Sequence, residues 1–312
     1  MTIYFNGDMM KVIDYSQIEE NIKTIKKTND IILVVKNNAY GFGIKRIVEI
    51  ALKNDIRMFA VNTIAEAIEL RRLTDRDILL FGYCVEYIDE IIKYQIIPTA
   101  NSLDEIAIFN KNKIYYALEI DIGMNRFGIK EYNESIFNNQ YLHHVYAHFY
   151  NENINYSKII NKIKKLCNKY NKKCHFGGSM LYSKTNESLR LGKLAYSDAL
   201  RLYGNVVMIK RLAKGEAVGY DSLYKAENDD EIIAVVDIGY YNGLRVYYDG
   251  YTYINNNRYK VVGKICMNHS FIKIDDKVSI GDMVEFLGKN ISIYEFLSHN
   301  NMTEYECFLS IK

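Results

Sequence analysis

The first residue of this sequence with a strong chemical signature is Lys36, which ends an apolar run. Residues 31–36 read IILVVK and are followed by NNAYGFG, up to Gly43. Such a run predicts a buried strand of a parallel sheet. A lysine at the end of a buried strand loses hydration, which favours its neutral amine. A neutral amine can form a Schiff base with an aldehyde. The alternative is a lysine that extends from the strand end into solvent.

Other polar residues follow apolar runs in the same way. His148 ends the run at 142–148, and Arg190 lies in the run at 188–191. Hydroxyl groups and backbone N–H groups at a helix start suit a phosphate, and Tyr40, Ser179 and Gly192 could supply them. Taken alone, each residue has a structural alternative: a satisfied strand-end histidine, a surface arginine, and a G-G-S turn.

The elements that must position these residues alternate between strand and helix. Amphipathic stretches separate most of the apolar runs, and capping-box patterns open helices at Ser16 and within residues 62–66. This alternation predicts an α/β fold, a (β/α)8 TIM-type barrel, with its chemistry at the C-terminal strand ends. An open doubly wound sheet is the alternative, but no G-x-G-x-x-G follows an early strand. The predicted strands are 31–36, 57–61, 78–82, 95–99, 115–121, 142–148, 173–176 and 188–191.

From about residue 206 the pattern becomes mostly β. Residues 231–238 are strand-like, and 245–253 and 258–267 flank a turn at 255–257, which predicts a hairpin. A helical pattern returns at 293–299. We therefore expect a barrel domain at 10–205 and a mostly β domain at 206–312, with residues 1–9 adding a strand to the second domain.

Composition restricts the class of protein. The 312 residues carry a net charge of about +2, so nothing indicates a nucleic-acid or membrane partner. The five cysteines form no C-x-x-C pair, which favours free thiols in a reducing cytoplasm over a disulfide framework or a zinc site. No signal peptide or membrane-length apolar run is present, so we expect a cytoplasmic protein and no metal.

Residues 34–43, VVKNNAYGFG, closely resemble the VVKANAYGHG motif of alanine racemases. The resemblance continues in order from about Met9 to the C-terminus. It implies a (β/α)8 barrel followed by a C-terminal β domain, pyridoxal 5'-phosphate (PLP) as cofactor, and a head-to-tail homodimer. The implied activity is amino-acid racemisation, with alanine as the expected substrate.

The resemblance also implies the catalytic residues. Lys36 binds PLP as a Schiff base and then acts as a base on one face of the substrate. Tyr220, in AVGYDSLY, resembles the tyrosine of VSYGATY, the second base, which comes from the other subunit. His148 relays between that tyrosine and an arginine. Arg190 contacts the PLP pyridine nitrogen, and because an arginine stays protonated it leaves that nitrogen largely unprotonated.

The remaining site residues follow from further matches. Tyr40, Ser179 and Gly192 match phosphate binders. Residues 118–128, LEIDIGMNRFG, resemble LKxDTGMGRLG, so Arg126 positions the substrate carboxylate or the cofactor ring oxygen; a salt bridge to Asp121 is the alternative. Residues 238–243 resemble IGYADG and 262–268 resemble VGRICMDQ. Tyr240 then narrows the entrance and the Met267 backbone touches the substrate, both across the dimer interface; packing is the alternative.

Two departures from the family keep other functions open. Glu119 stands where the family often has a carbamylated lysine that holds the arginine, and a glutamate has a shorter reach. Residues 304–312 do not match the family's R-x-P-R-x-Y, so the pocket mouth could admit serine or a larger amino acid. A PLP-binding protein without turnover is another alternative. A PLP decarboxylase is a third, against which Arg190 argues.

Overall fold

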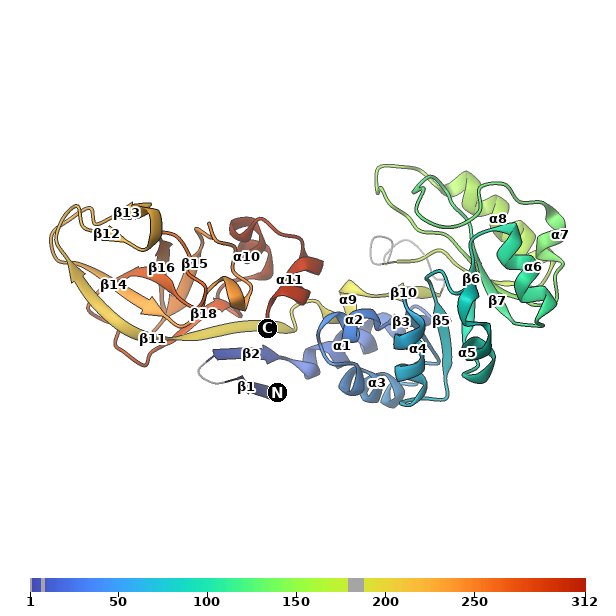
Figure 1. The fold of residues 1–312 in the computed structure, drawn as a ribbon, viewed down its shortest axis with the longest axis horizontal. Helices are drawn as coiled ribbons and strands as arrows, with labels where there is room; N and C mark the ends of the chain where they lie inside the picture. The colour runs from blue at the N-terminus through green and yellow to red at the C-terminus, as the bar shows by residue number, and fades with distance from the viewer. Residues whose placement is uncertain (1, 7–8, 179–187) are drawn as a thin grey trace. The chain divides into compact units, whose positions relative to one another are not determined.

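The computed structural model describes residues 2–6, 9–178 and 188–312. These residues form two compact units, one of Glu19–Ala195 and one of Met1–Ile18 with Tyr196–Lys312. Figure 1 labels their helices and strands in chain order.

The unit at Glu19–Ala195 is built on a sheet of eight parallel strands, each at one of the predicted apolar runs. Their order is β10-β3-β4-β5-β6-β7-β8-β9. Leu189 also bridges to Gly177, just after β9, so the sheet almost closes on itself. This confirms the predicted barrel. The strands are β3 (Ile31–Val34), β4 (Met58–Val61), β5 (Asp77–Leu80), β6 (Ile97–Ala100), β7 (Tyr116–Glu119), β8 (Leu142–Tyr146), β9 (Lys173–His175) and β10 (Leu189–Leu191).

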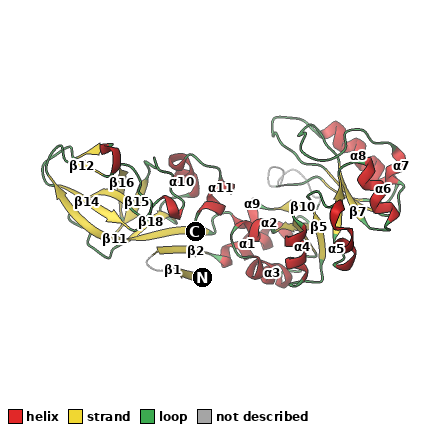
Figure 2. Ribbon diagram, in the orientation of Figure 1, coloured by secondary structure: helices red, strands yellow, loops and turns green. Residues whose placement is uncertain are grey.

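Helices alternate with these strands, as the two colours of Figure 2 show. The longer helices bury an apolar face; in α3 that face includes Ile44, Ile47 and Val48. The helical elements of this part of the chain are α1 (Tyr15–Lys26), α2 (Lys36–Tyr40), α3 (Ile44–Lys53), α4 (Ile64–Arg71), η1 (Val85–Tyr87), α5 (Ile88–Lys93), α6 (Leu103–Lys111), α7 (Glu134–Phe137), α8 (Ser157–Lys169) and α9 (Lys193–Tyr196).

Of the two expected helix starts, the one at α1 differs and the one at α4 is confirmed. The predicted capping box at Ser16 is wrong, because α1 already begins at Tyr15 and the Asp14 carboxylate accepts the Gln17 N–H at 3.1 Å. At α4 the capping box expected within residues 62–66 is present: the Thr63 hydroxyl accepts the Glu66 N–H at 3.2 Å, and the Glu66 carboxylate accepts the Thr63 N–H at 3.1 Å. At α1 the Asp14 carboxylate, two residues before Ser16, thus caps a free N–H group of the first turn.

The second unit is an antiparallel sheet that closes through the long strand β11. Residues 202–205 of β11 pair with β18 and residues 206–212 pair with β14, and a register shift interrupts the β14 pairing between Val206 and Met208. The mostly β prediction is therefore correct. The strands are β1 (Thr2–Asn6), β2 (Met9–Ile13), β11 (Leu200–Leu212), β12 (Ala217–Val218), β13 (Tyr224–Lys225), β14 (Glu231–Val236), β15 (Tyr251–Ile254), β16 (Asn257–Val262), β17 (Ser270–Ile274) and β18 (Met283–Leu287).

Short helices complete this unit. They are η3 (Tyr220–Ser222), η4 (Tyr240–Asn242), α10 (Ile293–Asn300) and α11 (Glu304–Ser310). The helical pattern at 293–299 predicted α10. Helix α11 was not predicted, although Thr303 and Glu306 form a capping box at its start.

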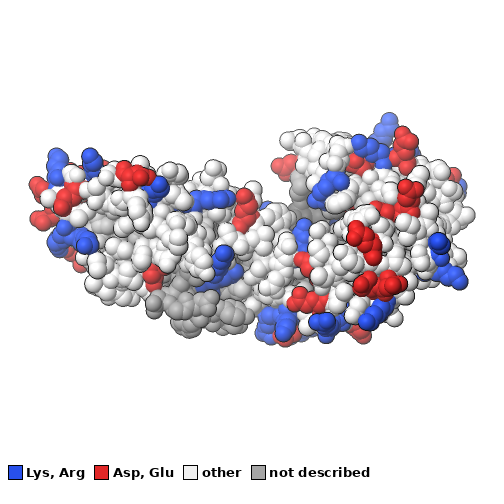
Figure 3. Space-filling model, in the orientation of Figure 1, with Lys and Arg blue, Asp and Glu red and all other residues white. Residues whose placement is uncertain are grey.

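Two observations concern the surface. None of the helices in the described residues is long and apolar enough to cross a membrane. Figure 3 shows basic and acidic side chains interspersed on the face drawn, over both units.

Candidate active site

Lys36 follows β3 and begins a turn of unusual backbone conformation. The four residues after it, 37–40, all have positive φ, from 52° to 55°. A left-handed conformation costs about 1–2 kcal/mol for each residue other than glycine, so this turn must be held by its surroundings. Backbone strain of this kind is concentrated at functional sites.

Two side chains hold the turn in place. The Glu66 carboxylate accepts the Asn37 N–H at 2.6 Å and also the N–H groups of Asn62 and Thr63. The Asn38 side-chain oxygen accepts the Ile44 N–H at 2.7 Å, at the start of α3. The turn is thus tied to two helices, which positions Lys36 at the C-terminal edge of the barrel sheet.

The Lys36 amine lies among other charged groups of this edge. Burial is the largest cause that lowers the pKa of Lys36, of His148 and of Arg190, and the nearby charge of Arg126 lowers all three further. Glu66 acts on Lys36 in the opposite direction. These four predicted residues therefore share one electrostatic environment, in which the Lys36 amine loses its proton more readily than an exposed lysine.

Arg190, in β10, is buried and held by neutral acceptors. It donates to the Ala147 carbonyl at 2.6 Å and to the His175 carbonyl at 2.5 Å, and it lies 2.9 Å from His175 Nδ1. Its guanidinium also lies over the Tyr146 ring. Burial lowers the pKa of Arg190 to about 10, so the side chain stays protonated at neutral pH.

His148, just after β8, bonds to the carboxylate of Glu119 at the end of β7. Its Nδ1 lies 2.6 Å from Glu119 Oε1, and the other carboxylate oxygen accepts the Tyr146 hydroxyl at 3.1 Å. None of the described hydrogen bonds of the Glu119 side chain is with Arg126. The glutamate's short reach explains this, because His148 and Tyr146 are the groups it meets.

Arg126 lies exposed on the loop after β7, beside the Phe127 ring. The alternative of a salt bridge to Asp121 is not found among the described residues. Asp121 instead accepts the N–H groups of Gly123 and Asn125 at 2.9 and 3.1 Å. The Arg126 guanidinium is therefore available to a ligand.

Two of the three expected phosphate binders meet. A Cβ added to Gly192 would lie 2.8 Å from the Tyr40 hydroxyl, so only glycine lets this hydroxyl approach the backbone there. Ser179, the third, lies outside the described residues.

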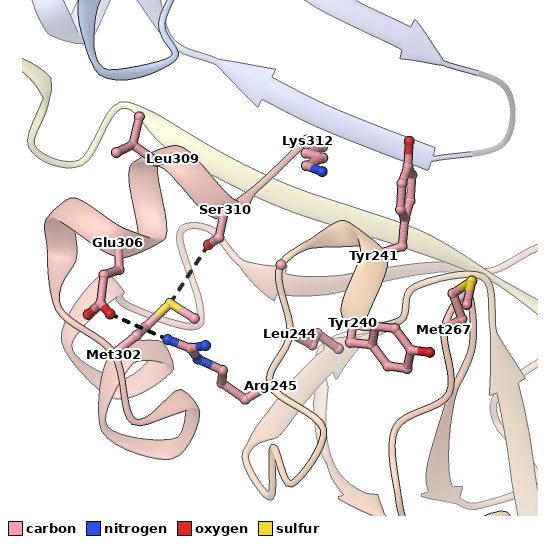
Figure 4. Close-up of a pocket in the computed structure, with 11 residues that line it drawn as sticks. Tyr240, Tyr241, Leu244, Arg245, Met267, Met302, Glu306, Leu309, Ser310 and Lys312 are labelled. Atoms are coloured by element: carbon pink, nitrogen blue, oxygen red, sulfur yellow. Dashed lines mark hydrogen bonds and ion pairs between the residues drawn. The ribbon is translucent and has the colours of Figure 1, made fainter. Parts of the chain in front are cut away.

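The other predicted residues belong to the second unit. Tyr220 lies in η3, between β12 and β13, with 66% of its surface exposed. Tyr240 and Met267 line one cavity of about 600 Å³, together with residues of α11. Figure 4 shows Tyr240 and Met267 side by side there, and the Arg245–Glu306 ion pair at the other side of the cavity.

Several residues of the site were not predicted. Glu66 holds the turn after Lys36, Tyr146 and His175 surround Arg190, and Thr99 lies 3.0 Å from the Tyr146 hydroxyl. Tyr146 and His148 are two residues apart, a spacing that places side chains on one face of a strand and could have indicated Tyr146. Glu66 belongs to the capping-box pattern within residues 62–66, but its bond to the Asn37 N–H joins residues 29 apart and leaves no signal in the sequence.

The fold and site together define an α/β-barrel protein with a C-terminal β unit and a partly buried lysine among basic side chains at its strand ends. The comparisons with known proteins agree with this class. Residues 13–165 match the family model "Alanine racemase, N-terminal domain", and 199–312 match "Alanine racemase, C-terminal domain". The chain belongs to the alanine racemase family.

Individual relatives cover nearly the whole chain. Alanine racemase 1 of Clostridium acetobutylicum is 30% identical over 331 residues, which are 89% of this chain and 85% of the relative. The alanine racemase of Borreliella burgdorferi is 28% identical over 352 residues, 96% of this chain and 94% of its own. Among solved structures, the alanine racemase of Clostridium difficile has the same fold, with a TM-score of 0.86 at 24% identity over 99% of this chain and 94% of that one.

Proposed function

We propose that this protein is a PLP-dependent racemase that interconverts L- and D-alanine. The observation that carries the proposal is the partly buried Lys36 at the end of β3, with burial and the charge of Arg126 lowering the pKa of its amine. Family membership supports the same activity, because the matched relatives are named alanine racemases. The supporting residues lie at the C-terminal strand ends, where barrel enzymes carry out their chemistry.

The residues at this edge fit PLP. A lysine amine of lowered pKa suits the aldehyde of the cofactor. The Tyr40 hydroxyl lies close to the Gly192 backbone, so a hydroxyl and a backbone N–H group are together where a phosphate could bind. Three of the five N–H groups of Arg190 bond to described residues, so donors remain for a pyridine nitrogen. Lys36, Tyr40, Gly192 and Arg190 would then hold the cofactor, together with Ser179.

When bound, PLP delocalises the negative charge left by removal of the Cα proton. Arg190 remains protonated and bonds to its neighbours, so it does not give its proton to an acceptor. This favours proton return over transamination or decarboxylation. Arg126, exposed and free of Asp121, would bind the substrate carboxylate in a bidentate way.

Inversion at Cα needs proton removal on one face and proton return on the other. We assign the first face to the Lys36 amine and the opposite face to the Tyr220 hydroxyl. To act as a base, the Tyr220 hydroxyl must first give its own proton to an acceptor. His148 is the candidate acceptor at the barrel edge.

We further propose a homodimer in which Tyr220, Tyr240 and the Met267 backbone of one subunit complete the site of the other. The 66%, 41% and 57% exposure of these three side chains supports this, because a shared site requires them at the surface of each subunit. The free cysteines are consistent with a cytoplasmic enzyme.

Replacement of Lys36 tests the proposal. In Lys36→Ala, we expect racemisation to fall by at least roughly 10²- to 10⁴-fold, and the borohydride-fixed pyridoxyl adduct at this position to disappear. Lys45→Ala, on the exposed face of α3, is the matched control and should change neither. The measurements are Cα deuterium exchange with chiral chromatography of alanine and serine, and peptide mass spectrometry. Undiminished racemisation in Lys36→Ala would overturn the proposal.

A further inference from the structure

The buried carboxylate of Glu119 has no role in the function proposed above. Its side chain is 4% exposed, and both oxygens bond to polar groups of β8 and the residues after it. A buried carboxylate is costly unless such bonds compensate it. Because the buried Glu119 carboxylate bonds directly to His148, its effect on this histidine is the function to examine.

The Glu119 side chain is held in a defined position. The Tyr146 hydroxyl that donates to it lies 3.0 Å from Thr99 Oγ1, so one chain of hydrogen bonds crosses the ends of β6, β7 and β8. The loop after β7 folds back on the same residue: a Cβ on Gly128 would lie 3.0 Å from Glu119 Cγ. Residues on both sides thus prevent the carboxylate from turning away from His148.

This contact determines the protonation of the imidazole. An ionised carboxylate only accepts hydrogen bonds, so the His148 nitrogen 2.6 Å away must donate. With the proton on Nδ1, the neutral ring has its lone pair on Nε2. The His148 side chain is 25% exposed, so the ring remains accessible to groups that enter the site.

The other charges around His148 act against the protonated ring. Burial, Arg190 on β10 and Arg126 on the loop after β7 lower the pKa of His148, and His148 is itself among the charges felt by His175 on β9. Glu119 alone among these described charged groups favours the imidazolium. Loss of its charge would leave a ring with a weaker affinity for a proton.

We propose that Glu119 is a positioning residue that holds His148 through Nδ1, so that Nε2 accepts the proton of the tyrosine base. This inference rests on the proposed racemase function. The proton moves from the phenol oxygen to His148 Nε2, and the developing imidazolium is stabilised by the Glu119 carboxylate. On the return step the same proton goes back to the phenolate.

Glu119→Gln separates charge from geometry. The glutamine oxygen can accept from Nδ1 and its amide can donate to the Tyr146 oxygen, so the variant keeps both hydrogen bonds without the charge. In protein labelled at histidine Cε1, we expect NMR titration to show the pKa of His148 lowered by roughly one to three units. In the holoenzyme, we expect kcat to fall at least about tenfold with KM changed less than about twofold.

Tyr146→Phe is the matched control, because it removes the second hydrogen bond to the same carboxylate while keeping the ring beside Arg190. Its His148 should titrate closer to wild type than that of Glu119→Gln. The His148 signal is assigned from its loss in His148→Gln.

The outcomes separate the two proposals. An unchanged titration of His148 in Glu119→Gln, or an unchanged kcat, would overturn the positioning role. Wild-type protein that racemises no amino acid would instead overturn the proposed function and the catalytic part of this inference. The titration would then still decide whether Glu119 controls the protonation of His148.

Discussion

At the scale of single residues, the barrel contains a buried histidine that makes no hydrogen bond to the part of the chain that the structure describes. His144, in β8, is 5% exposed, and neither ring nitrogen has a partner among the described residues. It packs against the rings of His143 and His175. Burial, followed by the charge of His143, lowers the pKa of His144 to about 3. Its folded form is therefore neutral over most of the pH range.

This predicts an acid-sensitive barrel. Because the folded pKa lies below the ordinary value of about 6.5, the unfolded chain binds the proton first. The stability that the neutral ring allows is present above about pH 6.5 and is lost as the pH falls toward 3. Between about pH 7 and pH 5, we expect the free energy of unfolding of His144→Phe to fall by about 2 kcal/mol less than that of the wild type.

Urea unfolding at both pH values, followed by circular dichroism, measures this difference. His269→Gln is the control, because the His269 side chain is exposed to solvent both in the folded protein and in the unfolded chain. An equal loss of stability in wild type and His144→Phe would refute the prediction.

At the scale of elements, the turn after β3 determines where the lysine lies. Its left-handed residues depend on Glu66, which belongs to α4 and accepts the Asn37 N–H. Strand, turn and helix therefore act as one unit around Lys36. Removal of the carboxylate frees the turn to leave its strained conformation.

We expect Glu66→Ala to weaken PLP binding at least about tenfold. A loss of about 1.4 kcal/mol in the stability of the turn conformation that positions Lys36 corresponds to a tenfold lower affinity. Thr63→Ala removes the cap of the same helix but leaves the Glu66–Asn37 bond. It should cost about 1 kcal/mol of stability and leave PLP affinity unchanged. Absorbance titration with PLP and urea unfolding measure the two effects. Equal PLP affinity in both variants would contradict this role of Glu66.

At the scale of the whole molecule, the proposed bases lie in different units: Lys36 in Glu19–Ala195 and Tyr220 in the other. A dimer with shared sites predicts complementation between two inactive variants. When Lys36→Ala and Tyr220→Phe subunits are mixed, unfolded and refolded together, half of the dimers are mixed, and each has one intact site. We expect recovery of about a quarter of wild-type activity.

The two variants refolded separately are the controls and should stay inactive. Mixing them would restore nothing if Lys36 and Tyr220 of the same chain formed each site, since neither chain has both. Absence of recovery, with mixed dimers demonstrated by two affinity tags, would therefore exclude the shared site.

Local pattern was enough to predict much of this fold. The eight barrel strands and the hairpin of β15 and β16 follow from apolar runs and turn residues, which are properties of neighbouring positions. Lys36 stood out because a charge directly after a buried strand is visible in the sequence. Helix α11 was missed because it is short, and Asp14 because several residues near it could cap α1 equally well.

The sequence by itself therefore determined the order of the elements, the strand end that bears Lys36 and the family motifs along the chain. Only the tertiary structure decided which side chains meet. The parallel pairing of β7 with β8 sets Glu119 opposite Tyr146, with a register shift at Tyr116, and so brings the carboxylate to His148 instead of Arg126. Register depends on packing between strands far apart in the chain, and a shift of one residue turns each side chain to the other face.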